Sequence, residues 1–271
     1  MSDRRPIGVF DSGVGGLTVA RAILDQLPHE PLIYVGDTAR FPYGPQPVDA
    51  IRTYALEIAR YLVARDVKML VVACNSIEVS AIGDIATGAR IPVIGVINPG
   101  ARAAIRATRN GIVGVIGTEA TVATGAYQRA VGSEVRLHAA ACPAFVEHVE
   151  AGDTTSDALR EAARGYLAPL KEEGIDTLIL GCTHYPLLSG LLQLELGQEV
   201  VLVSSADETA KDVYGSLVTN DIGNEPTETP HHEFLSTGDP RRFRELAELF
   251  LGGHELARVE AVQLEKEGSW S

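Results

Sequence analysis

Residues 176–186 read Asp-Thr-Leu-Ile-Leu-Gly-Cys-Thr-His-Tyr-Pro, an apolar run that ends abruptly in a cysteine. This pattern is typical of a buried parallel strand that delivers polar residues at its carboxyl end. Residues 68–76, Lys-Met-Leu-Val-Val-Ala-Cys-Asn-Ser, repeat it earlier in the chain. Cys182 follows Cys74 by 108 residues (182 − 74), and each cysteine comes one small residue after a run of aliphatics.

A second pair of segments recurs at nearly the same distance. Residues 7–12, Ile-Gly-Val-Phe-Asp-Ser, are similar to residues 113–118, Val-Gly-Val-Ile-Gly-Thr, with an offset of 106 (114 − 8). Two matched pairs at almost one offset indicate an internal duplication of domain-sized α/β units. If the two units face each other, Cys74 and Cys182 face each other across a cleft.

Strand-like and helix-like segments alternate along the whole chain. In the first unit, strands are expected at 7–10, 32–35, up to Cys74 and at 92–97, with the break Asn98-Pro99-Gly100 opening the second unit. The second unit has expected strands at 111–116, up to Cys142, up to Cys182 and at 200–203, with a helix near 121–131. A strand near 233–236, a helix over 240–251 and a strand near 259–262 close the chain. Such alternation predicts parallel sheets, with ligands at the carboxyl ends of the strands.

Bulk properties narrow the class of protein. The 271 residues suffice for one large or two ordinary domains, and the formal net charge of −13 argues against nucleic acid as a main ligand. Residues 1–5 lead directly into an apolar strand, and no apolar stretch approaches the roughly 20 residues of a membrane span. Three widely separated cysteines do not form a disulfide framework. We therefore expect a cytoplasmic protein with reduced thiols and no membrane contact.

The two matched cysteines allow three kinds of chemistry. An isolated free cysteine is usually a small core residue, and Cys142, which has no counterpart, is expected to be one. A redox pair would favour Cys-x-x-Cys, which is absent, and a metal site would need more ligands than Cys74, Cys182 and His184. Two acid/base groups on opposite sides of one carbon are what racemisation requires. We therefore favour acid/base thiols and expect no metal.

A thiol that removes a proton from carbon needs neighbours that tune its proton affinity. Asp11 is a candidate neighbour of Cys74, although an Asp at a strand end is often a helix cap. His184 and Glu150 are candidates beside Cys182. The run Gly13-Val14-Gly15-Gly16 lacks the spacing of nucleotide-binding loops and predicts a tight strand-to-helix turn.

Taken together, these segments resemble the glutamate racemases, cofactor-independent two-cysteine enzymes of bacterial cell-wall precursor synthesis. The resemblance runs over essentially the whole chain. It is carried by Gly8-Val9-Phe10-Asp11-Ser12-Gly13-Val14-Gly15-Gly16, Gly36-Asp37-Thr38-Ala39-Arg40-Phe41-Pro42-Tyr43-Gly44, Ala73-Cys74-Asn75-Ser76 and Gly181-Cys182-Thr183-His184-Tyr185-Pro186. It implies interconversion of L- and D-glutamate without a cofactor, and a homodimer. It also implies two similar α/β lobes, residues 1–98 with 210–271 and residues 99–209, with the active site between them.

The resemblance also assigns residues. It makes Cys74 and Cys182 the catalytic thiols, assisted by Asp11, His184 and Glu150. The substrate would be held by Asp11, Ser12, Pro42, Tyr43, Gly44, Asn75, Ser76, Thr118, Thr121, Thr183 and His184.

Two departures from the family pattern follow Cys74. Ser76 replaces the usual Thr and keeps the hydroxyl, whereas Ile77-Glu78 replaces small residues. The Glu78 carboxylate either complements a helix dipole or weakens the binding of an anionic substrate. Two other functions stay open: a two-thiol racemase for aspartate or a hydantoin, and a protein-binding role such as inhibition of DNA gyrase.

Overall fold

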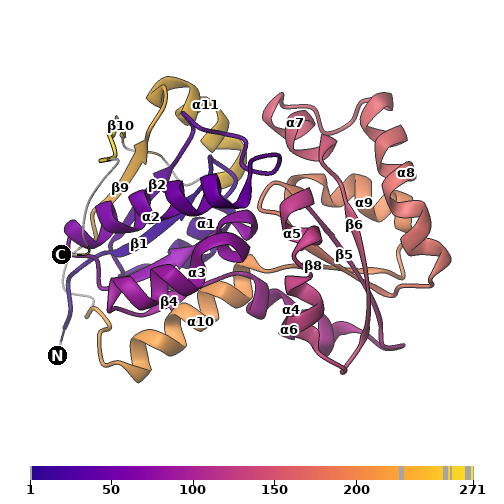
Figure 1. Ribbon diagram of the computed structural model, residues 1–271, viewed down its shortest axis with the longest axis horizontal. Coiled ribbons are helices and arrows are strands. Elements are labelled where there is room, and N and C mark those ends of the chain that lie inside the picture. The colour runs from indigo at the N-terminus through magenta and orange to yellow at the C-terminus, as the bar shows by residue number, and fades with distance from the viewer. Residues whose placement is uncertain (1, 226–228, 253–255, 257, 266–269, 271) are drawn as a thin grey trace.

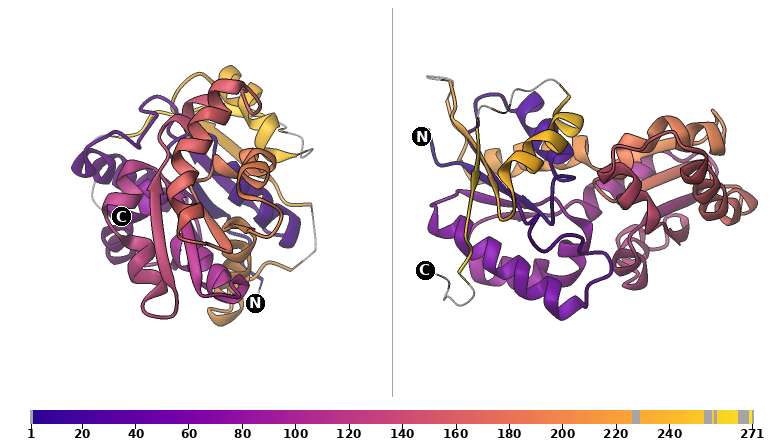
Figure 2. Two further views of the ribbon diagram at one scale, coloured as in Figure 1. Left: turned by 90° about the vertical axis from the view of Figure 1, so that its right-hand side faces the viewer. Right: turned by 90° about the horizontal axis from the view of Figure 1, so that it is seen from above.

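The computed structural model describes residues 2–225, 229–252, 256, 258–265 and 270, and it contains two parallel β-sheets (Figure 1). The six-stranded sheet has the order β10-β9-β2-β1-β3-β4, and the four-stranded sheet has the order β6-β5-β7-β8. We call the parts of the molecule built on these sheets lobe A and lobe B. The two lobes lie side by side along the long axis of the molecule, as the right panel of Figure 2 also shows.

The strands of lobe A are β1 (Ile7–Asp11), β2 (Leu32–Gly36), β3 (Met69–Val72), β4 (Val93–Ile94), β9 (His232–Ser236) and β10 (Val259–Ala261). Those of lobe B are β5 (Ile112–Gly117), β6 (Arg136–Ala141), β7 (Thr177–Gly181) and β8 (Val201–Ser204).

The two sheets share one strand order, as the repeated sequence segments predict. The order β2-β1-β3-β4 in lobe A corresponds to β6-β5-β7-β8 in lobe B. The repeated segments supply the two inner strands of each set, β1 and β3, and β5 and β7. All residues of β1, β3 and β7 are buried. The continuous apolar runs thus follow from helices covering both faces of a parallel sheet.

The helices connect successive strands within each lobe, except for two that link the lobes. They are α1 (Leu17–Gln26), α2 (Val48–Ala64), α3 (Asn75–Ala89), α4 (Ile97–Ala107), α5 (Glu119–Ala123), α6 (Ala126–Val131), α7 (Ala144–Glu150), α8 (Asp157–Glu172), η1 (Tyr185–Leu188), α9 (Ser189–Leu196), α10 (Ala206–Thr219) and α11 (Pro240–Leu251). Helix α4 leaves the edge strand β4 of lobe A and packs against β7 and β8 of lobe B. Helix α10 leaves β8 of lobe B and packs against α1 of lobe A. The two linking helices also contact each other.

The segment after α10 returns to lobe A. Strand β9 pairs with β2, β10 pairs with β9, and α11 packs against α1. The carboxyl-terminal part of the chain therefore extends the first sheet beyond the duplicated core. The division of the chain at 98/99 and 209/210 stays a prediction. No helix in the described ranges is both long enough and apolar enough to cross a bilayer.

Three local predictions were wrong in detail. The strand expected over 92–97 is only Val93–Ile94, and the expected break Asn98-Pro99-Gly100 lies inside the first turn of α4. Pro99 is tolerated there because the first turn of a helix does not use its backbone N–H groups in the helix itself. The helix expected near 121–131 is split into α5 and α6 by Gly125, which has a φ of 62°. A positive φ interrupts a right-handed helix, and glycine adopts it without strain.

Candidate active site

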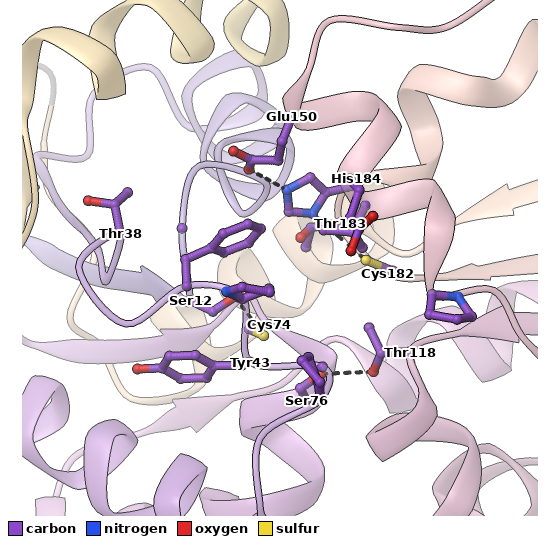
Figure 3. Close-up of a pocket in the computed structure, with 18 of the residues that line it drawn as sticks. Ser12, Thr38, Tyr43, Cys74, Ser76, Thr118, Glu150, Cys182, Thr183 and His184 are labelled. Atoms are coloured by element: carbon purple, nitrogen blue, oxygen red, sulfur yellow. Dashed lines mark hydrogen bonds and ion pairs between the residues drawn. The ribbon is translucent and has the colours of Figure 1, made fainter. Parts of the chain in front are cut away.

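A cavity of about 530 Å³ lies between the lobes, and both predicted thiols line it (Figure 3). Most of its wall comes from loops and helices that follow the carboxyl ends of strands in both sheets, where a parallel α/β fold places ligands. The lining residues are Ser12, Gly13, Thr38, Phe41, Pro42, Tyr43, Gly44, Pro45, Cys74, Asn75, Ser76, Thr118, Glu119, Pro143, Val146, Glu147, Glu150, Cys182, Thr183, His184, Asp239, Arg242, Phe243 and Leu246. Of the predicted site residues, only Asp11 and Thr121 are not among them.

Cys74 connects the end of β3 to the start of α3. It occupies the N-cap position of the helix in an extended conformation, and its thiol donates to Ser12 Oγ over 3.6 Å. Burial, and then the charge of Asp11, raise the pKa of the Cys74 thiol. The backbone N–H of Ile77 in the first turn of α3 and the Ser12 hydroxyl act in the opposite direction. The net effect favours the protonated thiol.

Asp11 lies behind the cavity wall rather than in it. Its side chain is fully buried, and Oδ2 accepts a hydrogen bond of 2.6 Å from the backbone N–H of Gly16. Oδ1 has no hydrogen-bond partner among the described residues. Asp11 therefore holds the turn that begins α1 and also acts on the Cys74 thiol through its charge. The sequence suggested that Asp11 caps a helix or neighbours Cys74, and its position in the structure is compatible with both roles.

On the lobe B side, Cys182, His184 and Glu150 form a chain of contacts. His184 Nδ1 lies 3.8 Å from Cys182 Sγ, and Nε2 lies 2.8 Å from Glu150 Oε1 (Figure 3). Burial lowers the pKa of His184, but the hydrogen bonds with Cys182 and Glu150 outweigh it and raise the value to about 10. His184 is thus an imidazolium at neutral pH, with one N–H directed to each partner. The rings of Phe41 and Phe250 pack against it at centroid distances of 5.8 and 5.5 Å.

The glycines after β1 allow lobe A to approach this group closely. A Cβ atom on Gly15 would lie 2.5 Å from Thr183 Oγ1 and 2.6 Å from the His184 ring. A Cβ atom on Gly16 would lie 2.6 Å from Asp11 Cβ. The predicted tight turn is present, and it also brings the lobe A backbone against lobe B.

Hydroxyl and amide groups connect the lobes at another part of the wall. Ser76 Oγ lies 2.9 Å from Thr118 Oγ1, which lies 3.0 Å from Thr121 Oγ1 (the Ser76–Thr118 contact is drawn in Figure 3). Thr118 is also the N-cap of α5, accepting from the backbone N–H of Thr121. The Asn75 side-chain amide donates to the Tyr127 hydroxyl over 2.9 Å. Thr121 therefore orients Thr118 rather than facing the cavity itself.

The loop after β2 presents backbone and ring atoms to the cavity. The Tyr43 hydroxyl donates to Asp37 Oδ2, and Arg40 Nε lies 2.7 Å from the same oxygen. Asp37 Oδ1 accepts from the Thr237 hydroxyl over 2.6 Å. Tyr43 thus contributes its ring and main chain to the cavity, because its hydroxyl is engaged by Asp37.

Glu78 does not line the cavity. Its Oε2 accepts hydrogen bonds from the backbone N–H groups of Val96, at 2.5 Å, and Ile97, at 3.0 Å. These groups open α4, the helix that leads to lobe B, and a Cβ atom on Gly95 would collide with the carboxylate. The Glu78 carboxylate therefore complements the start of a helix, as one of the two sequence interpretations proposed, although that helix is α4 rather than α3. Burial raises the pKa of Glu78 to about 7, against the opposing effect of the two N–H groups.

Apart from Glu150, the residues contributed by α7 and α11 were not identified from the sequence. Val146 and Glu147 come from α7, and Arg242, Phe243 and Leu246 come from α11. They follow no recognisable motif, and α11 reaches the cavity only because the end of the chain returns to lobe A. Among the residues that the structure describes, no group of three or more His, Cys, Asp or Glu is arranged to hold a metal ion.

Two thiols from two duplicated parallel α/β lobes, lining one cavity, define the class of two-base racemases. Comparison with known proteins agrees, because the family model of the Asp/Glu/Hydantoin racemases matches residues 7–213. A glutamate racemase from Acidothermus cellulolyticus is 56% identical over 250 residues, covering 91% of this chain and 95% of the relative.

Solved structures give the same result. The glutamate racemase isoform RacE1 of Bacillus anthracis matches with a TM-score of 0.91 and 41% identity, covering 96% of this chain and 98% of that one. The glutamate racemase of Francisella tularensis, crystallised in complex with D-glutamate, matches with a TM-score of 0.90 and 35% identity over the same shares. The chain belongs to the Asp/Glu/Hydantoin racemase family.

Proposed function

We propose that this protein is a glutamate racemase that interconverts L- and D-glutamate by proton transfer between Cys74 and Cys182. The observation that supports the proposal best is that the two thiols come from corresponding strand ends of different sheets and line one cavity. A carbon atom held between them would have a proton donor on one side and a proton acceptor on the other.

The reaction requires one bond to break and one to form at the α-carbon. A thiolate takes the α-proton, forming an S–H bond while the C–H electron pair stays on the substrate. The opposite thiol then gives its proton to the other face of the carbon and becomes the thiolate. The product has inverted configuration, and the two sulfurs have exchanged protonation states, so the reverse reaction uses them in the opposite roles.

The surroundings of the two thiols differ in charge. The imidazolium of His184, held by Glu150, would stabilise negative charge on Cys182 Sγ. Burial and the charge of Asp11 favour the neutral Cys74 thiol. Cys74 is therefore expected to rest as the protonated thiol, ready to act as the proton donor.

The remaining predicted residues supply polar groups for the substrate. Ser12, Asn75, Ser76, Thr118 and Thr183 carry hydroxyl or amide groups on the cavity wall. Such neutral groups can donate to two carboxylates and accept from an ammonium group without adding fixed charges beside the reacting carbon.

Glutamate is preferred over aspartate or a hydantoin as the substrate because the more similar relatives are glutamate racemases. The D-glutamate produced would supply peptidoglycan precursor synthesis. With it we propose a cytoplasmic location and a homodimer, in line with the resemblance of the sequence. A contact with DNA gyrase is not part of the proposal.

The proposal is tested by incubating the purified protein with L-glutamate and following the optical rotation. The rotation should decay to zero as an equal mixture of enantiomers forms, and L-aspartate should be converted far more slowly. Dialysis against a chelator and a carbonyl-trapping reagent should leave the activity intact. An unchanged rotation of L-glutamate would refute the proposed function.

A further inference from the structure

Helices α7 of lobe B and α11 of lobe A both contribute residues to the cavity wall. Figure 1 shows the two helices on either side of the boundary between the lobes. Val146, Glu147 and Glu150 line it from α7, at spacings that put them on one helix face. Arg242, Phe243 and Leu246 line it from α11. On α11, Phe243 and Phe250 are buried, and Phe250 packs against His184, so the helix is fixed to the site from within.

The charges on this wall are unevenly balanced. Four carboxylates line the cavity, those of Glu119, Glu147, Glu150 and Asp239. Arg242 supplies the one Lys or Arg side chain among the lining residues that the structure describes. The whole chain adds a formal charge of −13. An anionic substrate therefore approaches against a negative field unless a local cation offsets it.

Structural contacts already compensate two of the carboxylates. Glu150 is bonded to the His184 imidazolium, and Asp239 caps α11 by accepting from the backbone N–H of Arg241 over 2.9 Å. Glu119 and Glu147 form no ion pair with any described residue. The Arg242 side chain likewise forms no hydrogen bond or ion pair within the described part of the chain, and the residue is exposed. Its guanidinium is thus available to a ligand rather than committed to the fold.

We propose that Arg242 is a specificity-determining residue that offsets the negative wall and so favours amino acids with a second carboxylate. This inference rests on the proposed racemisation of glutamate. A dicarboxylic amino acid carries a net charge of −1 at neutral pH, whereas its amide analogue carries none, so the cation favours the former. Arg242 acts on binding from the cavity wall and takes no part in proton transfer. Loss of the Arg242 charge should therefore raise KM rather than lower kcat, and salt should weaken this effect by screening the charge.

The experiment compares Arg242→Gln with Arg241→Gln, which removes the same charge from the next position of α11. The Arg241 side chain is 92% exposed and does not line the cavity, and its Nε lies 3.7 Å from Oδ1 of the lining residue Asp239, so this variant removes the same net charge together with the partner of one lining carboxylate. Arg242→Gln should raise the KM for glutamate about threefold to tenfold at low ionic strength, with kcat within about twofold of wild type. Arg241→Gln, which only exposes an already solvated carboxylate, should change either constant by less than about twofold, and Arg242→Lys should keep most of the wild-type affinity.

Salt provides a second readout that misfolding would not mimic. Raising the ionic strength should reduce the difference in KM between the wild type and Arg242→Gln, because salt screens the charge that distinguishes them. Equal KM values for Arg242→Gln and Arg241→Gln, or a loss that appears in kcat at unchanged KM, would overturn the inference. Neither outcome would contradict the proposed function, which is refuted only if the wild-type protein does not racemise glutamate.

Discussion

Gly15 of lobe A lies against His184 of lobe B so closely that a single added carbon atom would not fit. A Cβ atom at position 15 would come within 2.6 Å of the imidazole ring. The same ring links the predicted catalytic thiol Cys182 to Glu150. The glycine therefore determines how near the two halves of the site can lie to each other.

Gly15→Ala should displace His184 or separate the lobes. We expect kcat to fall by a factor of about ten or more, because the geometry of the proton-transfer groups changes, and stability to fall by about 1–3 kcal/mol from overpacking. Gly165→Ala is the matched control, since Gly165 is exposed within α8 and an added Cβ meets nothing within 4 Å. The control should keep full activity and gain up to about 1 kcal/mol of helix stability. Full activity in Gly15→Ala would show that the close contact is not required.

Glu150→Gln should change the protonation of His184. The pKa of His184, about 10 in the folded protein against an ordinary 6.5, should fall, because the carboxylate that pairs with the imidazolium is lost. Because the pKa of His184 is higher in the folded than in the unfolded protein, its protonation stabilises the folded state. This contribution is fully present below the unfolded pKa of 6.5 and is lost as the pH rises through about 10. The wild type should therefore exceed Glu150→Gln in unfolding free energy by about 3 kcal/mol near neutral pH and by less toward pH 10. Denaturant unfolding at several pH values measures this, and a pH-independent difference would argue against the charged pair.

Asp11→Asn should make the Cys74 thiol more acidic. The charge of Asp11 raises the pKa of Cys74, whereas an asparagine can still accept the hydrogen bond from Gly16. The pH dependence of alkylation, measured with Cys142 and Cys182 replaced by Ser, should move down by about one pH unit. An unchanged profile would mean that Asp11 serves only to hold the turn.

Glu78→Gln tests the connection between the lobes. The pKa of Glu78 is raised from 4.5 to about 7 on folding, so the unfolded chain releases this proton at lower pH than the folded chain. The wild type should therefore lose up to about 3 kcal/mol of stability as the pH rises from about 4.5 through about 7. Glutamine can accept the same N–H groups and does not titrate, so the variant should lack this loss while its KM for glutamate is unchanged. A wild-type profile as flat as that of the variant would contradict the burial of an ionisable group at this helix end.

The site residues that directly follow strand ends could be predicted from the sequence. Apolar runs ending in polar residues located Cys74 and Cys182, because strand burial and the alternation of strands and helices are local patterns. His184 and Glu150 were both predicted as neighbours of Cys182, and the structure shows in addition that they pair with each other.

Other features depend on contacts that no local pattern encodes. Arg242 reaches the cavity because β9 adds to β2 and carries α11 back to lobe A. The partner of Glu78 is the start of α4, eighteen residues further along the chain. The chain break expected at Pro99 was misplaced because a proline in the first turn of a helix and one in a loop look alike in the sequence.

In the proposed mechanism, Cys74 and Cys182 act on opposite faces of one carbon. Serine is a far weaker acid and base than cysteine, so Cys74→Ser and Cys182→Ser should each lower racemisation by several powers of ten, and the double variant should be little worse. Cys142→Ser should retain most of the activity and serves as the control for loss of a buried thiol.

The most direct test is the α-deuterium content of both enantiomers at early times, when L-glutamate is racemised in heavy water. Two opposed thiols predict that the D-glutamate formed carries deuterium, because its proton donor exchanges with solvent, while the remaining L-glutamate keeps its original proton. The same asymmetry should appear with D-glutamate as the starting material. Equal deuterium in the product and in the recovered substrate would mean that one group serves both faces, and it would contradict the two-thiol mechanism.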